Sequence, residues 1–108
     1  MLRRSVLTTI AGGMALAAMP AAAASDVSVM IDNFSFSPAE VTVAVGTRII
    51  FTNRDDIPHT VTDSAQPRMF KSPAMDTGES FAFTFEKPGT TRYFCSLHPH
   101  MMGSVVVR

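Results

Sequence analysis

The feature that most restricts the fold of this chain is a succession of seven short runs rich in Val, Ile, Phe and Thr, none of which has a helical period. The runs cover residues 27–31, 40–45, 48–53, 60–63, 80–85, 90–95 and 104–107. Proline, glycine and a polar Asn-Arg-Asp-Asp stretch separate them, and such residues are typical of turns. Short strands at this spacing predict an all-β fold, a Greek-key antiparallel β-sandwich.

The run at 80–85 has the clearest strand pattern, because Phe81, Phe83 and Phe85 fall on one face. The segment 64–78 contains two prolines, which predict a loop with room for a short helical turn. An immunoglobulin-like sandwich is excluded, since the chain has no tryptophan and only one cysteine.

Residues 1–24 have the order of a secretory signal peptide: a positive start with Arg3 and Arg4, a moderately apolar run and an alanine-rich cleavage site. The apolar run falls short of the roughly 20 residues that a spanning helix needs, which makes a membrane anchor the weaker interpretation. The arginine pair resembles a twin-arginine export signal, but ordinary export of the unfolded chain fits as well. We therefore expect residues 25–108 to form the mature domain, located in the periplasm.

The predicted mature domain is mildly acidic, because loss of Arg3 and Arg4 leaves seven Lys and Arg against nine Asp and Glu. It contains no block of basic residues, so we expect neither a nucleic-acid partner nor binding to an anionic membrane. We also expect no membrane span after signal removal. Cys95 is the only cysteine, which rules out a disulfide within the chain. A lone thiol in an oxidising compartment needs protection, and a bound metal ion provides it.

The sequence around Cys95 contains a candidate metal motif, Cys-x2-His-x2-Met, formed by Cys95, His98 and Met101 between two predicted strands. A further candidate ligand, His59, lies upstream in Pro-His-Thr-Val at the start of another predicted strand. One thiolate, two imidazoles and one thioether form the mixed donor set that suits copper in its two oxidation states. The motif predicts a single copper ion held by these four side chains.

This pattern resembles the cupredoxins, the type 1 blue copper proteins, and within them most closely the amicyanins. The similarity follows the strand order of the whole mature chain, from residues 38–43 through Pro58 and His59 to residues 103–107. The two-residue gaps of the Cys-x2-His-x2-Met loop match the short loop of amicyanins, whereas plastocyanin-like and azurin-like members have longer loops. The resemblance implies a cupredoxin-like sandwich.

Roles for the four ligands follow from the resemblance. It implies that His59 is the buried imidazole, Cys95 the strong thiolate ligand and Met101 the weak axial ligand. In the family, the histidine after the cysteine has an exposed ring edge through which electrons pass, and by position this residue is His98.

Three positions depart from the family pattern. Thr60 stands where many members carry an asparagine that ties the two copper loops together; a threonine hydroxyl could bond to the loop backbone, although its reach is shorter. His100 replaces an apolar residue of amicyanins and is either a rim residue or a third imidazole ligand. Met102 adjoins Met101 as a competing thioether, and the spacing favours Met101.

The predicted function is that of a periplasmic, monomeric electron carrier without catalytic activity. A copper chaperone or storage protein is the alternative, to which His100 and the extra methionines would contribute. An enzyme would require an open position on the metal. The resemblance implies redox partner proteins, with an amine dehydrogenase or another redox enzyme as donor and a c-type cytochrome as acceptor.

Overall fold

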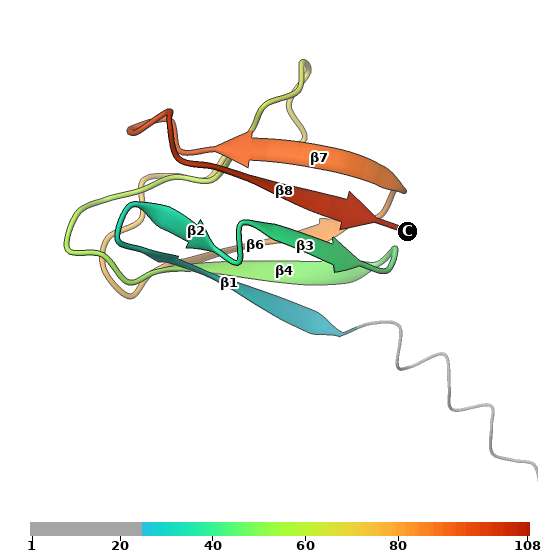
Figure 1. The fold of residues 1–108 in the computed structure, drawn as a ribbon, viewed down its shortest axis with the longest axis horizontal. Coiled ribbons are helices and arrows are strands. Elements are labelled where there is room, and N and C mark those ends of the chain that lie inside the picture. Colours follow the sequence, from blue (N-terminus) through green and yellow to red (C-terminus); the bar gives the residue numbers. More distant parts are fainter. Residues whose placement is uncertain (1–24) are drawn as a thin grey trace, which may run out of the picture.

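The computed structural model describes residues 25–108, and the predicted signal peptide lies outside the described residues. The described chain forms eight strands arranged in two sheets (Figure 1). The strands are β1 (Asp26–Asp32), β2 (Ser35–Ser37), β3 (Glu40–Val43), β4 (Thr47–Asn53), β5 (Thr62–Asp63), β6 (Ser80–Phe85), β7 (Gly89–Phe94) and β8 (Met102–Val107). The predicted all-β sandwich is confirmed.

The two sheets are mixed rather than purely antiparallel. One has the order β2-β1-β4-β6 and the other β3-β8-β7-β5. Two pairs are parallel, β1 with β4 and β3 with β8, while the remaining pairs are antiparallel. Between β1 and β4 the chain crosses to the opposite sheet to form β3, and this detour lets β4 return beside β1 in the same direction.

All seven predicted strands are present, with ends that differ from the prediction by no more than two residues. The prediction missed β2, a strand of three residues that pairs with β1. The described segment 64–78 contains no helical turn and is tied down instead by isolated bridges, Thr62 with Lys71 and His59 with Met75.

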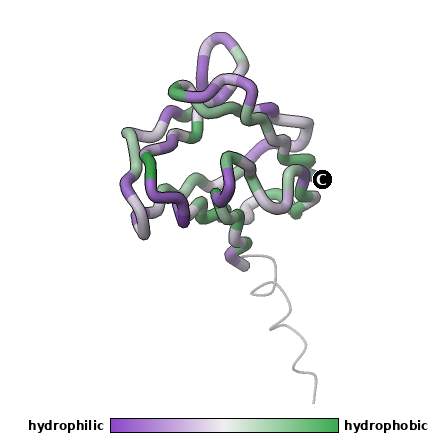
Figure 2. Tube along the Cα trace, turned by 60° about the vertical axis from the view of Figure 1, so that its left-hand side comes forward, coloured by the Kyte–Doolittle hydropathy of each residue, from purple (hydrophilic) through white to green (hydrophobic). Residues whose placement is uncertain are grey.

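The core lies between the two sheets and follows the strand alternation. In β4 every second residue is buried, and Ile49 and Phe51 face inward between exposed or half-buried neighbours. Tyr93 of β7 reaches across the sandwich, with its ring centroid 4.7 Å from that of Phe36 and 5.3 Å from that of Phe51. Figure 2 shows hydrophobic and hydrophilic residues alternating along the chain, with hydrophilic stretches in the loops.

Gly103 of β8 makes room for the Tyr93 ring, which lies opposite it in the strand pairing. A Cβ atom at Gly103 would lie 2.4 Å from Cζ and from Oη of Tyr93. No side chain fits in that space without moving the buried ring. The start of β8 is therefore fixed against β7, directly after the loop that carries the candidate ligands.

Candidate metal centre

Three of the predicted ligands converge at one end of the sandwich. The donor atoms of His59, Cys95 and His98 all lie within 4.8 Å of one another. The Cys95 sulfur is 3.7 Å from Nδ1 of each histidine. His59 and Cys95 are fully buried, whereas His98 is half-buried. The two imidazoles and the thiol thus face one another, and His98 is the member of the three that is partly exposed to solvent.

The loop that joins β7 to β8 closes on itself through its backbone. The His98 amide donates to the Cys95 carbonyl oxygen at 3.2 Å, and the Met101 amide donates to the His98 carbonyl oxygen at 2.9 Å. The Cys95 amide in turn donates to the Met101 carbonyl oxygen at 3.1 Å. The short spacing of the motif therefore gives a rigid loop whose shape depends on main-chain bonds and on the two flanking strands.

The two adjacent methionines differ in exposure. Met101 is 2% exposed and belongs to the hydrophobic core cluster, whereas Met102 is 66% exposed. Met101 therefore lies on the interior side of the loop, and Met102 lies on the solvent side. His100 is exposed and lies outside the His-Cys-His cluster found among the described residues.

Thr60 joins the two halves of the site. Its hydroxyl oxygen accepts a hydrogen bond from the Ser96 amide at 2.8 Å and lies 2.8 Å from the Ser96 hydroxyl. Its own amide donates to the Cys95 sulfur at 3.3 Å. The link to the loop backbone that the sequence suggested for this hydroxyl is therefore present, and the Thr60 amide adds a donor that stabilises negative charge on the sulfur.

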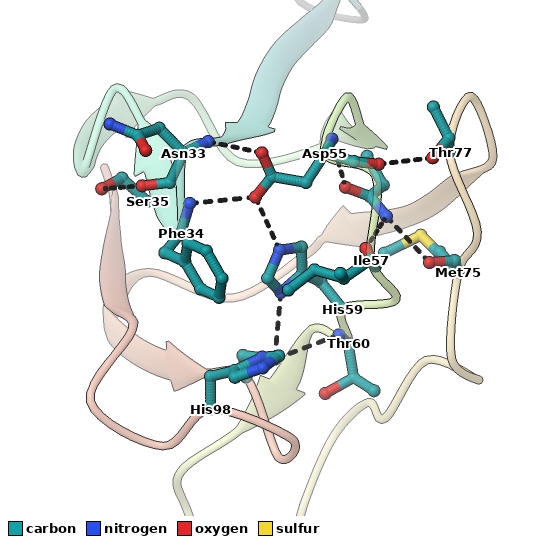
Figure 3. A network of polar contacts seen from close by, with 12 residues as sticks. Asn33, Phe34, Ser35, Asp55, Ile57, His59, Thr60, Met75, Thr77 and His98 are labelled. Atoms are coloured by element: carbon teal, nitrogen blue, oxygen red, sulfur yellow. Dashed lines mark hydrogen bonds and ion pairs between the residues drawn. The ribbon is translucent and has the colours of Figure 1, made fainter.

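His59 is held from two sides. Its backbone forms an isolated bridge with Met75, with N–H···O distances of 3.2 Å and 2.9 Å. Its ring atom Nε2 lies 2.8 Å from a carboxylate oxygen of Asp55, whose side chain is 13% exposed (Figure 3). Nδ1 of the same ring is the atom that faces the Cys95 sulfur.

The Asp55 carboxylate also accepts backbone hydrogen bonds from Asn33 at 2.6 Å and Phe34 at 2.9 Å. Burial acts to raise the pKa of Asp55, but the hydrogen bonds from Phe34, His59 and Asn33 outweigh it and lower the pKa to about 2. Asp55 is therefore ionised beside His59 at neutral pH.

Asn53, at the end of β4, organises the segment that carries His59. This fully buried side chain donates to the carbonyl oxygens of Ile57 and Met75, both at 2.9 Å, and accepts from the Asp55 amide at 2.9 Å. The sequence of residues 53–56 predicts only a turn. The sequence signal that could have indicated the role of Asn53 is its position at the end of an apolar strand, because Asn side chains there often form hydrogen bonds that close turns.

The donor set fits copper. A thiolate with two imidazoles is the combination found in trigonal copper sites with a weak axial thioether. The fold brings these donors together from two separate loops, so the protein and not the metal sets their spacing. The Thr60 amide and the Asp55 carboxylate complete the surroundings, one at the sulfur and the other at an imidazole.

Comparison with known proteins agrees with this geometry. The family of copper binding proteins described as the plastocyanin/azurin family matches residues 23–108. The chain belongs to this family. It is therefore a copper-binding cupredoxin with a His-Cys-His site of the type 1 kind.

Amicyanins are prominent among its relatives. Amicyanin-alpha of Methylorubrum extorquens is 33% identical over 106 residues, which cover 95% of this chain and 88% of that protein. The structure of a reduced amicyanin variant superposes with a TM-score of 0.73 at 32% identity, covering 77% of this chain and 82% of the other. A purple cupredoxin from Nitrosopumilus maritimus gives 0.72 at 32% identity, covering 77% of this chain and all of that one.

Within residues 25–108, the structure contains no helix that is both long and apolar enough to cross a membrane.

Proposed function

We propose that this cupredoxin is a periplasmic blue-copper protein that carries single electrons between redox proteins, after export with loss of residues 1–24. The observation that carries the proposal is the convergence of the His59, Cys95 and His98 donor atoms within 4.8 Å, at a site fixed by the fold. Copper bound there supplies one-electron redox chemistry. A site whose geometry the protein imposes changes little between oxidation states, which favours rapid transfer.

We assign the four ligands as His59, Cys95, His98 and Met101. Cys95 provides the thiolate, and the Thr60 amide stabilises its charge. His59 provides the buried imidazole. Met101 provides the axial thioether, which is supported by its burial beside an exposed Met102. Because all four positions are filled by protein, we expect no room for a substrate and no enzymatic activity.

His98 is the proposed contact point for redox partners. It is the half-buried member of the cluster, and two exposed apolar side chains accompany it: Leu97 in the same loop, and Phe34, whose ring centroid lies 5.2 Å from that of His98. An apolar rim around an accessible imidazole suits brief contacts with other proteins. We expect an amine dehydrogenase or another redox enzyme as electron donor and a c-type cytochrome as acceptor.

The alternative function, a copper chaperone or storage protein, is not favoured by the comparisons, in which amicyanins are prominent. Two exposed residues near the site, His100 and Met102, are the features that favour this alternative. These two side chains lie outside the His-Cys-His cluster. A site built to release copper would need accessible side chains among its ligands.

Electron self-exchange distinguishes the two functions. NMR line broadening in mixtures of the oxidised and reduced copper protein should reveal rapid exchange near neutral pH, and a c-type cytochrome should oxidise the reduced form. The same sample should retain copper(I) in the presence of a competing copper-binding protein. Negligible exchange together with ready loss of copper(I) would reject the carrier and favour the chaperone.

A further inference from the structure

A single carboxylate connects the metal centre to a turn far away in the sequence. Asp55 lies between the ring of His59 and the turn that joins β1 to β2, formed by Asn33 and Phe34 (Figure 3). One oxygen accepts from the Asn33 amide, and the other accepts from the Phe34 amide and faces Nε2 of His59. All three N–H groups depend on the same side chain.

The contact with Asp55 determines which nitrogen of His59 carries the proton. An ionised carboxylate only accepts hydrogen bonds, so the His59 nitrogen beside it must be the N–H. The proton then lies on Nε2, and Nδ1 keeps its lone pair toward the Cys95 sulfur, 3.7 Å away. A metal ligand needs that free lone pair, and carboxylates that orient ligand histidines are a recurrent device.

The same carboxylate holds the turn in an unfavourable conformation. Asn33 and Phe34 have φ angles of 53° and 59°, in the left-handed region. Asparagine tolerates this region, whereas a bulky residue such as phenylalanine adopts it rarely. The two backbone hydrogen bonds to Asp55 offset this strain. Without them, the turn would relax to a less strained conformation.

The strained turn places the Phe34 ring against both histidines. The ring meets His59 edge-on, with centroids 5.6 Å apart and planes at 84°, and meets His98 in the same way at 5.2 Å and 89°. Phe34 is still 45% exposed, so its burial alone does not account for its position. The ring covers one side of the imidazole pair with apolar surface.

We propose that Asp55 is a positioning residue of the copper centre with two linked effects: it fixes the proton of His59 on Nε2, and it holds the Asn33–Phe34 turn so that the Phe34 ring covers both imidazoles. The inference rests on the proposed ligand roles of His59 and His98. It adds that the β1–β2 turn, which contributes no ligand, belongs to the metal centre.

The matched test compares Asp55→Asn with Asp56→Asn. Both changes remove one negative charge, but Asp56 is exposed. An asparagine at position 55 offers a single acceptor oxygen for three donors, and its NH₂ group faces an N–H. In the copper-loaded protein we expect Asp55→Asn to weaken copper(II) binding about 10–100-fold and to raise the reduction potential, with little change in Asp56→Asn.

The metal-free protein provides a readout independent of copper. Nitrogen-15 NMR at about pH 8, above the ordinary imidazole pKa, should show the His59 proton on Nε2 in the wild type and a mixture of tautomers in Asp55→Asn. Proton contacts between the Phe34 and His98 rings should weaken in the same variant. Asp56→Asn should match the wild type in both respects.

Phe34→Gly separates the ring from the turn, because glycine adopts positive φ freely. This variant should fold, keep the His59 tautomer and expose the His98 ring protons to broadening by a soluble paramagnetic probe. A wild-type His59 with its proton on Nδ1 would overturn the proposal, even if Asp55→Asn failed to fold. Equal effects of Asp55→Asn and Asp56→Asn would also overturn it. A wild-type copper(II) complex without the blue band would instead reject the proposed function and leave the NMR results standing.

Discussion

The two loops that form the metal centre are built in different ways. The Cys95–Met101 loop is short, lies between adjacent antiparallel strands and is closed by three backbone hydrogen bonds. The segment that carries His59 has a backbone bridge to Met75 and is otherwise held by side chains, with Asn53 and Asp55 bonding to backbone groups and to the His59 ring. One half of the site therefore depends on main-chain geometry, and the other depends in addition on two polar side chains.

This difference indicates where each half is sensitive to mutation. Side-chain substitutions that spare the ligands should have small effects in the short loop and large effects in the His59 segment. Changes that disturb the strands beside the short loop should damage that half instead. Thr60 and Ser96 connect the halves and should contribute modestly.

The largest effect is expected at Asn53. Replacing it with alanine removes the side-chain donor to the Ile57 carbonyl, one of the two donors to the Met75 carbonyl, and the acceptor for the Asp55 amide. We expect Asn53→Ala to lower the free energy of unfolding of the metal-free protein by about 3 kcal/mol or more, measured in urea. Ser96→Ala, in the opposite loop, should cost about 1 kcal/mol or less. Equal losses would remove the distinction between the two halves.

The next effect tests the strands that flank the short loop. In Gly103→Ala the new methyl group would lie 2.4 Å from the Tyr93 ring, which is buried against Phe36 and Phe51. We expect a loss of about 1–3 kcal/mol, because overpacking a filled core forces the ring or the strand to shift. Thermal unfolding of the metal-free variant measures this loss, and an unchanged midpoint would show that the space beside Tyr93 is not tight.

Asp55 should make the free energy of unfolding depend on pH. Its pKa is about 2 in the folded protein against an ordinary value of 3.8, so its ionised form stabilises the fold above about pH 4. This contribution, about 2 kcal/mol, is lost as the pH falls from about 4 to about 2. The stability gap between the metal-free wild type and Asp55→Asn should therefore narrow over that range in urea unfolding. A gap that stays constant would contradict this role of the carboxylate.

The smallest effect concerns the connection between the halves. Thr60→Val keeps the shape of the side chain but removes the acceptor of the Ser96 amide. We expect a loss of about 1 kcal/mol in the metal-free protein, typical of one hydrogen bond. Thr60→Ser, which keeps the hydroxyl, should restore most of it. A valine variant as stable as the wild type would show that the backbone alone fixes the distance between the loops.

The parts of the molecule that could be predicted from the sequence are those encoded by local spacing. Strand alternation located seven of the eight strands, and the two-residue gaps around Cys95 placed this residue and His98 in one loop. β2 was missed because three residues carry too little pattern. The parallel pairing of β1 with β4 depends on a crossover that no local pattern encodes.

The side-chain support of the site was harder to predict than the convergence of His59, Cys95 and His98. Asp55 bonds to Phe34 across 21 positions in the sequence, and the partner is a backbone amide whose position depends on the fold. Asn53 acts in the same way on distant carbonyl groups. Thr60 was recognised in advance because it occupies a position with a known role in the family, next to His59.

The central claim is that Cys95 binds copper together with His59 and His98, and the visible absorption spectrum of the mature protein with copper(II) tests it most directly. A thiolate bound to copper(II) gives an intense blue or blue-green charge-transfer band, which we expect in the wild type and which Cys95→Ser should abolish. A colourless wild-type complex, or a band that persists in Cys95→Ser, would contradict the account.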